Sequence, residues 1–240
     1  MKEEDSPKFL MNTLLNNSSS PEQKHLNLVH LQMSTRIQNQ HTHHLLCSDD
    51  DAAMLGGRYP SVSTSVVPSG YDPAYFTKGK DRTDRDPQHI VFVGSMDYGP
   101  NSGAVTRFVG RVMPLLLARR PSLHFSIVGR NPAPEILALA SPNITVTGDV
   151  PDVRPYLAKA SLMVVPLLVG GGTRLKIVEA MGMDCPVVSS TIGAEGLGLT
   201  HDQELLLADD SEPFAEAILA LLDDPERADM LANKARKFVE

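Results

Sequence analysis

Six short runs of apolar, largely β-branched residues recur from His89 onward, and each is bounded by glycine, proline or aspartate. Between these runs, apolar residues return every three or four positions, as they do along one face of a helix. Strands of nearly continuous apolar sequence that alternate with helices are typical of a parallel sheet with both faces covered. The sequence therefore predicts an α/β fold with a doubly wound parallel sheet. The expected strands are HIVFVG, LHFSIVG, NITVTG, ASLMVVPLL, PVVSS and ELLLAD.

The helical pattern is clearest between the first two expected strands, where Val105, Phe108, Val109, Val112 and Leu115 fall at helical spacing. We expect a single amphipathic helix there. Further helices are expected at PEILALA, VRPYLAK, TRLKIVEAM and PFAEAILALLDD, and a last one over residues 225–239. Together these elements predict one complete Rossmann-like domain over residues 87–240.

The chain before residue 87 has a different composition. Residues 1–24 are polar and carry an Asn- and Ser-rich stretch, so we expect a disordered tail. Residues 25–86 are expected to form a separate small part. In it, HHLLCSDDDAAML predicts a short strand, a turn and a helix capped by Ser48 or Asp49. The prolines and glycines of VVPSGYDPAYF and KGKDRTDRDPQ predict a linker into the domain.

The bulk composition narrows the class of function. A content of 42% hydrophobic and 21% charged residues is ordinary for a globular protein, and a net charge of −7 argues against wrapping nucleic acid. The N-terminus lacks the basic and long apolar parts of a signal peptide, and no apolar run approaches the ~18 residues of a membrane span, which predicts a cytosolic chain. His41, His43 and His44 follow no common ligand spacing, so we expect no metal site there.

The stretch VGGGTRLKIVEAM over residues 169–181 carries chemistry that a plain strand-to-helix turn does not need. Gly171 and Gly172 would let a ligand approach the backbone closely, and the N–H groups of a following helix favour an anion. Thr173 can cap that helix or donate to a phosphate oxygen. Arg174 and Lys176 add two positive charges where the helix dipole is already positive, a local conflict that is typical of a functional site.

Glu179 lies ~9 Å along the helix axis from Thr173 and shares one face with Gly172 and Lys176. A carboxylate there could accept hydrogen bonds from the two hydroxyls of a ribose. Leu175 and Val178 are expected on the buried face. The stretch is neither a Walker A loop nor G-x-G-x-x-G. By itself it leaves two interpretations open, a phosphate cradle with a ribose-binding carboxylate, or a glycine-rich turn with a capping threonine and a surface Lys–Glu pair.

Five segments, in order and spacing, resemble the donor-binding half of retaining GT-B glycosyltransferases, and most of all the large bacterial family of exopolysaccharide and lipid-linked glycan sugar transferases. The resemblance extends from about His43 to Val239, and VVPSGYDPAYF is similar to the family's interdomain linker. It implies that a nucleotide-diphosphate sugar is the donor for transfer to a glycan or lipid-linked acceptor, with no metal or other cofactor. The segments are VFVGSMDYGPNSGAV, FSIVGRNPAP, VTGDVPDVRPYLAKA, VVPLLVGGGTRLKIVEAM and CPVVSSTIGAEGL.

The resemblance implies a role for particular residues. Those expected to bind the donor, through a first glycine loop, a contact to the base, a diphosphate-contacting backbone and a ribose-binding glutamate, are Gly94, Ser95, Val150, Gly171, Gly172, Thr173 and Glu179. The residues expected to act in catalysis, by stabilising negative charge on the leaving diphosphate, are Arg130, Arg174 and Lys176. Gly171 stands where many members have a sugar-contacting glutamate, which leaves the sugar undetermined.

The resemblance also implies that residues 25–86 are the remnant of an N-terminal acceptor domain, most of which has no counterpart here. Three interpretations follow. The chain is a donor half that requires a separate acceptor-domain chain, or a truncated and non-catalytic nucleotide-sugar-binding fragment, or a doubly wound epimerase or oxidoreductase. Absence of G-x-G-x-x-G counts against the third. The expected location is the cytoplasm, with contact to the inner membrane face through an acceptor or partner as an alternative.

Overall fold

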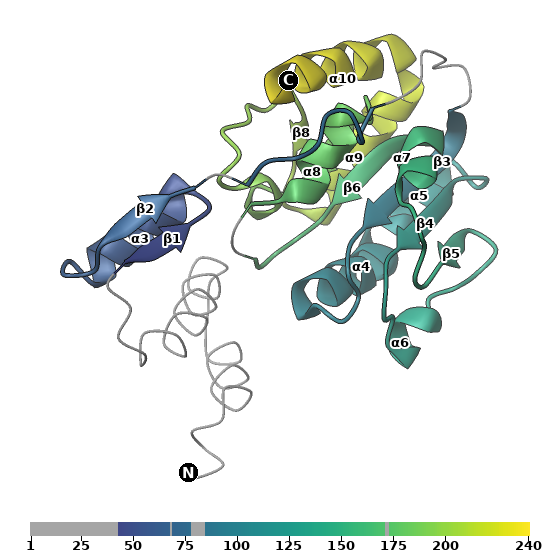
Figure 1. Cartoon of the computed structure of the whole chain (residues 1–240). Helices are drawn as coiled ribbons and strands as arrows, with labels where there is room; N and C mark the ends of the chain where they lie inside the picture. The colour runs from purple at the N-terminus through teal and green to yellow at the C-terminus, as the bar shows by residue number, and fades with distance from the viewer. Residues whose placement is uncertain (1–42, 68, 78–84, 171–172) are drawn as a thin grey trace. The chain divides into compact units, whose positions relative to one another are not determined.

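The computed structural model describes residues 43–67, 69–77, 85–170 and 173–240 (Figure 1). The expected tail at residues 1–24 and the first part of the expected remnant lie outside the described residues. The chain divides into two compact units, one of Met1–Ser69 with Leu168–Thr173 and one of Gly70–Leu167 with Arg174–Glu240. Each unit is described by itself.

The larger unit contains a six-stranded sheet in the order β5-β4-β3-β6-β7-β8, and all neighbouring strands in it are parallel. Because strand order follows chain order outward in both directions from β3 and β6, the direction of winding reverses between these two strands. This is the doubly wound arrangement that the sequence predicts. The strands are β3 (Asp86–Val93), β4 (His124–Val128), β5 (Ile144–Val146), β6 (Ala160–Val165), β7 (Val187–Ser189) and β8 (Leu206–Leu207).

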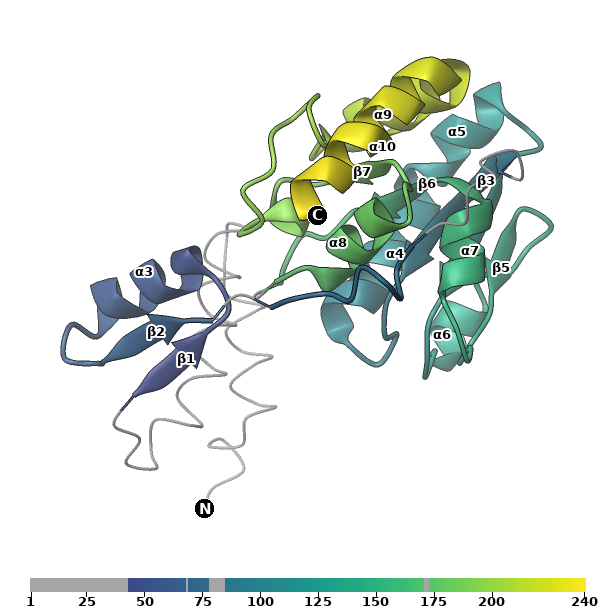
Figure 2. The same cartoon turned by 45° about the horizontal axis from the view of Figure 1, so that its top comes forward.

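Helices cover both faces of this sheet (Figure 2). Alternate side chains along each strand point to opposite faces, so Ile90 and Phe92 of β3 join one apolar core while Val91 and Val93 join the other. On the Phe92 side, the core is completed by α4 (Gly99–Arg111), α5 (Met113–Arg119), α6 (Pro134–Leu137) and α9 (Ser211–Asp223). The opposite core is completed chiefly by α7 (Arg154–Lys159) and α8 (Leu175–Gly182). Helix α10 (Pro225–Val239) contributes to both cores, with Ala228 and Leu231 on the Phe92 side and Ala235 on the other.

The single helix expected after β3 is in fact two helices, α4 and α5, which meet at Val112. Pro114 lies in the first turn of α5 and has no backbone N–H, so it cannot continue the hydrogen-bond ladder of α4. The apolar face is nevertheless continuous: Val105, Phe108 and Val112 are buried, and the partly buried Val109 and Leu115 pack against the same core. The periodicity predicted the buried face correctly and missed the break.

The smaller unit contains two parallel strands, β1 (His44–Leu46) and β2 (Thr64–Val66), connected by α3 (Asp49–Arg58). Ser48, one of the two residues predicted to cap this helix, is the N-cap of α3. Its Oγ accepts from the backbone N–H of Asp51 at 3.1 Å and donates to the Asp51 carboxylate at 2.8 Å. His43 bonds through both ring nitrogens to Ser63 and Ser65.

Candidate functional site

The carboxyl ends of β3 and β4 lead into two loops that lie side by side. Val93 at the end of β3 is in register with Val128 at the end of β4. Backbone bonds then continue past the strands, from Gly94 N–H to the Val128 carbonyl and from Met96 N–H to the Arg130 carbonyl, both 2.9 Å. The two loops are therefore held together at the carboxyl edge of the sheet, where ligands of doubly wound sheets bind.

Two side-chain bonds also join these loops. Arg130 donates from Nε to the Ser95 hydroxyl at 2.6 Å, and Asn131 donates from Nδ2 to the Asp97 carboxylate at 2.9 Å. Asn131 has a φ of 53°, a left-handed conformation that asparagine tolerates better than most residues. The exposed guanidinium of Arg130 is thus oriented by Ser95, a neutral partner.

A hollow of about 210 Å³ opens beside this pair of loops. One side of the hollow is lined by glycine and valine residues at the ends of β3 and β4. Its polar side is lined by Ser95 and Arg130. Val150, which follows β5 and was expected to contact a base, lines the same hollow together with Asp149. The structure therefore brings four of the sequence-predicted residues, Gly94, Ser95, Arg130 and Val150, to one cavity.

Helix α8 begins at Leu175, two residues after Thr173, where the expected helix starts. Arg174 is its N-cap residue, without a side-chain capping bond, and Thr173 instead donates its hydroxyl to the Cys47 carbonyl at 3.2 Å within the smaller unit. The buried face of α8 is formed by Ile177, Ala180 and Met181.

The expectation that Leu175 and Val178 are the buried residues of α8 was wrong, because both are only partly covered. The face toward the sheet is turned by one position, so that Ile177 lies where Val178 was expected. Gly171 and Gly172, the expected diphosphate-contacting backbone, lie outside the described residues.

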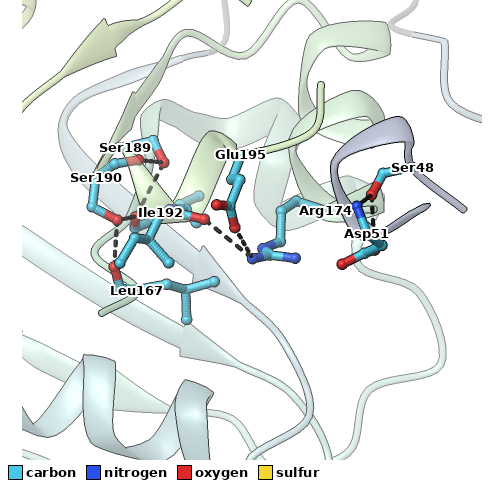
Figure 3. Close-up of polar contacts among 10 residues, drawn as sticks. Ser48, Asp51, Leu167, Arg174, Ser189, Ser190, Ile192 and Glu195 are labelled. Atoms are coloured by element: carbon cyan, nitrogen blue, oxygen red, sulfur yellow. Dashed lines mark hydrogen bonds and ion pairs between the residues drawn. The ribbon is translucent and has the colours of Figure 1, made fainter. Parts of the chain in front are cut away.

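Arg174 is almost wholly buried, with a relative exposure of 6%. Its guanidinium donates to the Ile192 carbonyl at 3.2 Å and lies 3.8 Å from the Glu195 carboxylate, as Figure 3 shows. Ile192 belongs to the short helix η3 (Ile192–Ala194), which follows β7. The described contacts of Arg174 therefore join the start of α8 to the loop after β7.

The same loop is anchored from its other end by two buried serines (Figure 3). Ser190 donates to the Leu167 carbonyl and accepts from the Gly193 N–H at 2.9 Å, while Ser189 donates to the Val165 carbonyl at 3.3 Å. Val165 ends β6 and Leu167 follows it, so these bonds align the segments that leave β6 and β7. The serines satisfy backbone groups, which is a structural role.

Lys176 extends from the first turn of α8 toward the loop after β3. Its Nζ donates to the side-chain oxygen of Asn101 at 2.8 Å and lies 4.4 Å from the centre of the Phe92 ring. A β-carbon placed on residue 94 would lie 2.7 Å from this Nζ, so the ammonium sits directly against Gly94. Glycine at this position leaves the space that the ammonium occupies.

The surroundings of Lys176 change its protonation. Burial lowers the pKa of Lys176 to about 7, the nearby charge of Arg174 lowers it as well, and Glu179 acts in the opposite direction. Glu179 lies one turn further along α8, and burial raises the pKa of its carboxyl while Lys176 lowers it. A bound anion would favour the charged ammonium and so increase the protonated fraction of Lys176. This lysine is therefore suited to a site that binds an anion.

Asn101 is not among the residues that the sequence predicted for the site. Asn101 lies in the first turn of α4 with 6% exposure, and besides accepting from Lys176 it donates from Nδ2 to the Ser95 carbonyl at 2.8 Å. The sequence did contain one indication of this role, because Asn101 is a polar residue on the face of the expected helix that points to the core.

Within the described residues, no group of three or more His, Cys, Asp or Glu side chains is placed to hold a metal ion. No helix in that part of the chain is both long enough and apolar enough to span a bilayer.

The family model for "Glycosyl transferases group 1" matches residues 87–224, more than half of the chain. The chain belongs to this family. A protein of Klebsiella pneumoniae, described as an uncharacterized 44.6 kDa protein in cps region, is 25% identical over 169 residues. That match covers 67% of this chain and 44% of the relative, so the chain spans less than half of the relative's length.

Solved structures agree with the family at the level of the fold. TarM of S. aureus has a TM-score of 0.74 at 15% identity, over 87% of this chain and 42% of TarM. HepE from Anabaena, in complex with UDP and glucose, has a TM-score of 0.72 at 15% identity, over 92% of this chain and 64% of HepE. The parallel α/β sheet of the larger unit therefore matches the folds of GT-B glycosyltransferases, which confirms the predicted fold class and the predicted family.

Proposed function

We propose that residues 87–240 bind a nucleotide-diphosphate sugar, and that the chain supplies the donor-binding part of a retaining sugar transfer to a glycan or lipid-linked acceptor. The observation that carries this proposal is the meeting of Arg130, Lys176 and Gly94 at the carboxyl ends of the strands, next to the reversal of winding between β3 and β6. Family membership supports it, and so does the structural likeness to HepE, which was solved with UDP and glucose.

The arrangement is suited to a diphosphate for a physical reason. Arg130 and Lys176 approach the first loop from two sides, and their hydrogen-bond acceptors, Ser95 and Asn101, are neutral. The N-terminus of α8 adds the positive end of a helix dipole. Such groups can stabilise the negative charge that grows on a leaving diphosphate as a glycosidic bond breaks.

The remaining donor residues have narrower proposed roles. Val150 would contact the base from the hollow that it lines with Arg130. Glu179 would accept hydrogen bonds from the ribose hydroxyls, in which case its raised carboxyl pKa must fall when the carboxylate binds them. Arg174 would act through the loop after β7, whose Ile192 carbonyl it binds, rather than by touching phosphate.

The test is a calorimetric titration of the purified chain with UDP, GDP and ADP and their glucose conjugates. We expect saturable binding to one base series, and Glu179→Ala should weaken it about ten-fold through loss of the ribose contact. Glu204→Ala, which changes the same residue type on the exposed turn before β8, should leave affinity unchanged. Failure to bind any of the six ligands would refute the proposal.

Sugar transfer is tested separately from binding. Release of nucleoside diphosphate from the bound donor, in the presence of a lipid-linked or oligosaccharide acceptor, would support a transferase. Binding that persists with no transfer to any acceptor would support the alternative of a non-catalytic nucleotide-sugar-binding chain. Retention would be read from the anomeric configuration of the product.

A further inference from the structure

The two cations of the candidate site are both held by neutral oxygen atoms. Arg130 donates to the Ser95 hydroxyl at 2.6 Å, and Lys176 donates to the Asn101 side-chain oxygen at 2.8 Å. A neutral acceptor orients a cation without cancelling its charge. A carboxylate in either place would form an ion pair and remove one positive charge from the site.

The orientation of the Asn101 amide follows from its two bonds. Its NH₂ group donates to the Ser95 carbonyl at 2.8 Å, and a carbonyl can only accept. The amide oxygen must therefore face Lys176, whose ammonium can only donate. Because Asn101 is nearly fully buried in the first turn of α4, neither bond is readily replaced by water.

The bonds of Asn101 join three segments that are far apart in the sequence. Asn101 belongs to α4, Ser95 to the loop after β3 and Lys176 to α8. Through Ser95, whose hydroxyl accepts from Arg130, the same chain of bonds reaches the loop after β4. One amide thus aligns both cations relative to the carboxyl end of β3.

We propose that Asn101 is a positioning and specificity residue, which holds Lys176 and Ser95 in place while leaving the charge of Lys176 available to a diphosphate. This inference rests on the proposed donor site and goes beyond it. Asparagine and aspartate have nearly the same shape, but the aspartate carboxylate would neutralise the Lys176 ammonium. The site therefore requires asparagine. Asn101 acts through Lys176 and Ser95.

The environment of Lys176 makes its charge sensitive to whether the side chain at residue 101 is neutral. The face of the Phe92 ring lies under the ammonium, and Arg174 and Glu179 are the charged groups that act on it from α8 and its N-cap. The charge of Arg174 opposes that of Lys176, and among the described residues Glu179 favours it. A second carboxylate at residue 101 would pair with the ammonium in the absence of ligand and compete with phosphate for it.

The experiment compares the affinities of four proteins for UDP and for uridine, measured by calorimetry on the full chain. The four are the natural protein, Asn101→Asp, Asn101→Ala and the control Thr106→Asp. Thr106 lies on the exposed side of α4, where its hydroxyl donates to the Ser102 carbonyl, and its variant has the same net charge as Asn101→Asp. If GDP or ADP binds best in the titration of the natural protein, that nucleotide and its nucleoside replace UDP and uridine.

We expect Asn101→Asp to lower the UDP affinity by at least about ten-fold while uridine affinity stays within about two-fold. Asn101→Ala should fall between the natural protein and Asn101→Asp, because it loses the same bond to Ser95 and adds no negative charge. Thr106→Asp should retain the UDP-to-uridine affinity ratio. A purely structural role for Asn101 would lower both affinities together.

The outcomes separate the two proposals. If the natural protein binds no nucleotide, the proposed function fails and the inference falls with it. If the natural protein binds UDP and Asn101→Asp binds it as well as Asn101→Ala does, the inference alone is overturned. Should Asn101→Asp fail to fold by circular dichroism, Asn101→Ala decides: an unchanged UDP-to-uridine ratio overturns the inference, and a lowered ratio supports it.

Discussion

The carbonyl oxygen of Gly94 lies 1.8 Å from the position that a β-carbon on residue 129 would occupy. No side chain can be added at Gly129 unless the loop after β3 moves away from the loop after β4. The contact keeps Ser95 and Arg130 within bonding distance of each other. The closeness of the two glycines is therefore a condition for the shape of the candidate site.

We predict that Gly129→Ala destabilises the chain by about 3 kcal/mol, because the added methyl group overpacks rigid backbone. Nucleotide binding should weaken at the same time, since the two loops separate. Gly103→Ala is the matched control. Gly103 lies in α4 with no atom within 4 Å of its would-be β-carbon, so alanine there should be neutral or stabilise by up to about 1 kcal/mol. Urea denaturation measures both, and equal stabilities would contradict the prediction.

Arg174→Met should cost about 2 kcal/mol of unfolding free energy, because it leaves the Ile192 carbonyl without this donor and the Glu195 carboxylate without this nearby charge. Arg174→Lys should recover less than half of that loss, since an ammonium does not reproduce the guanidinium fork. Arg107→Met, which removes a longer 3.4 Å bond to the Asp209 carbonyl, provides the comparison and should change stability by less than about 0.5 kcal/mol. Thermal unfolding with a common heating rate measures all three.

Donor affinity should depend on pH through Lys176. Its pKa in the free protein is about 7, and a bound diphosphate would raise it, so binding takes up a proton above that pH. Affinity for UDP-glucose should then be constant below about pH 6 and decline as the pH rises through 7 toward about 9. Lys176→Met should bind more weakly and show no such decline. Calorimetry in two buffers of different ionisation enthalpy measures the proton uptake, and equal apparent enthalpies at pH 8 would count against it.

His89 should make the fold sensitive to acid. It is buried on β3 with its Nε2 bonded to Ser126, and its pKa is lowered to about 4, chiefly by burial. The charges of His124 and Lys159 lower the pKa as well, whereas Asp86 raises it. The contribution of neutral His89 to the free energy of unfolding is complete above the unfolded-state pKa of 6.5. It is lost as the pH falls toward 4, and amounts to about 3 kcal/mol in all.

The matched variant for this prediction is His89→Gln, which keeps a polar group near Ser126 but does not titrate. Its unfolding free energy should change less than that of the natural protein between pH 7 and about pH 4. Denaturation curves at several pH values give the comparison. Parallel pH profiles for the two proteins would assign the acid sensitivity to other groups.

Much of the fold was predictable because strand and helix periodicity are local properties of the chain. The six apolar runs are the six strands of the sheet, and the expected helices from PEILALA onward are all present. The errors had two sources. Pro114 divided one expected helix into two. In α8, apolar residues stand on more than one face, and packing buried Ile177 rather than Val178.

The candidate site was predictable only in its parts. Gly94, Ser95, Arg130 and Lys176 were each expected from the resemblance, but no pattern in the sequence predicted that an amide would join them. The bond between Asn101 and Lys176 spans 75 positions of the chain. A contact of that length depends on which strands are neighbours in the sheet, and α4 and α8 belong to opposite sides of it.

The sequence by itself therefore determined the alternation of strands and helices, the burial of the strands and the set of glycines and cations that end up in the loops. Those features depend on residues close together along the chain, through hydrogen bonding within helices and the burial of apolar faces. The tertiary structure decided which of these residues meet. Strand order placed the ends of β3 and β4 together, and packing of α4 and α8 on the sheet brought Asn101 to Lys176.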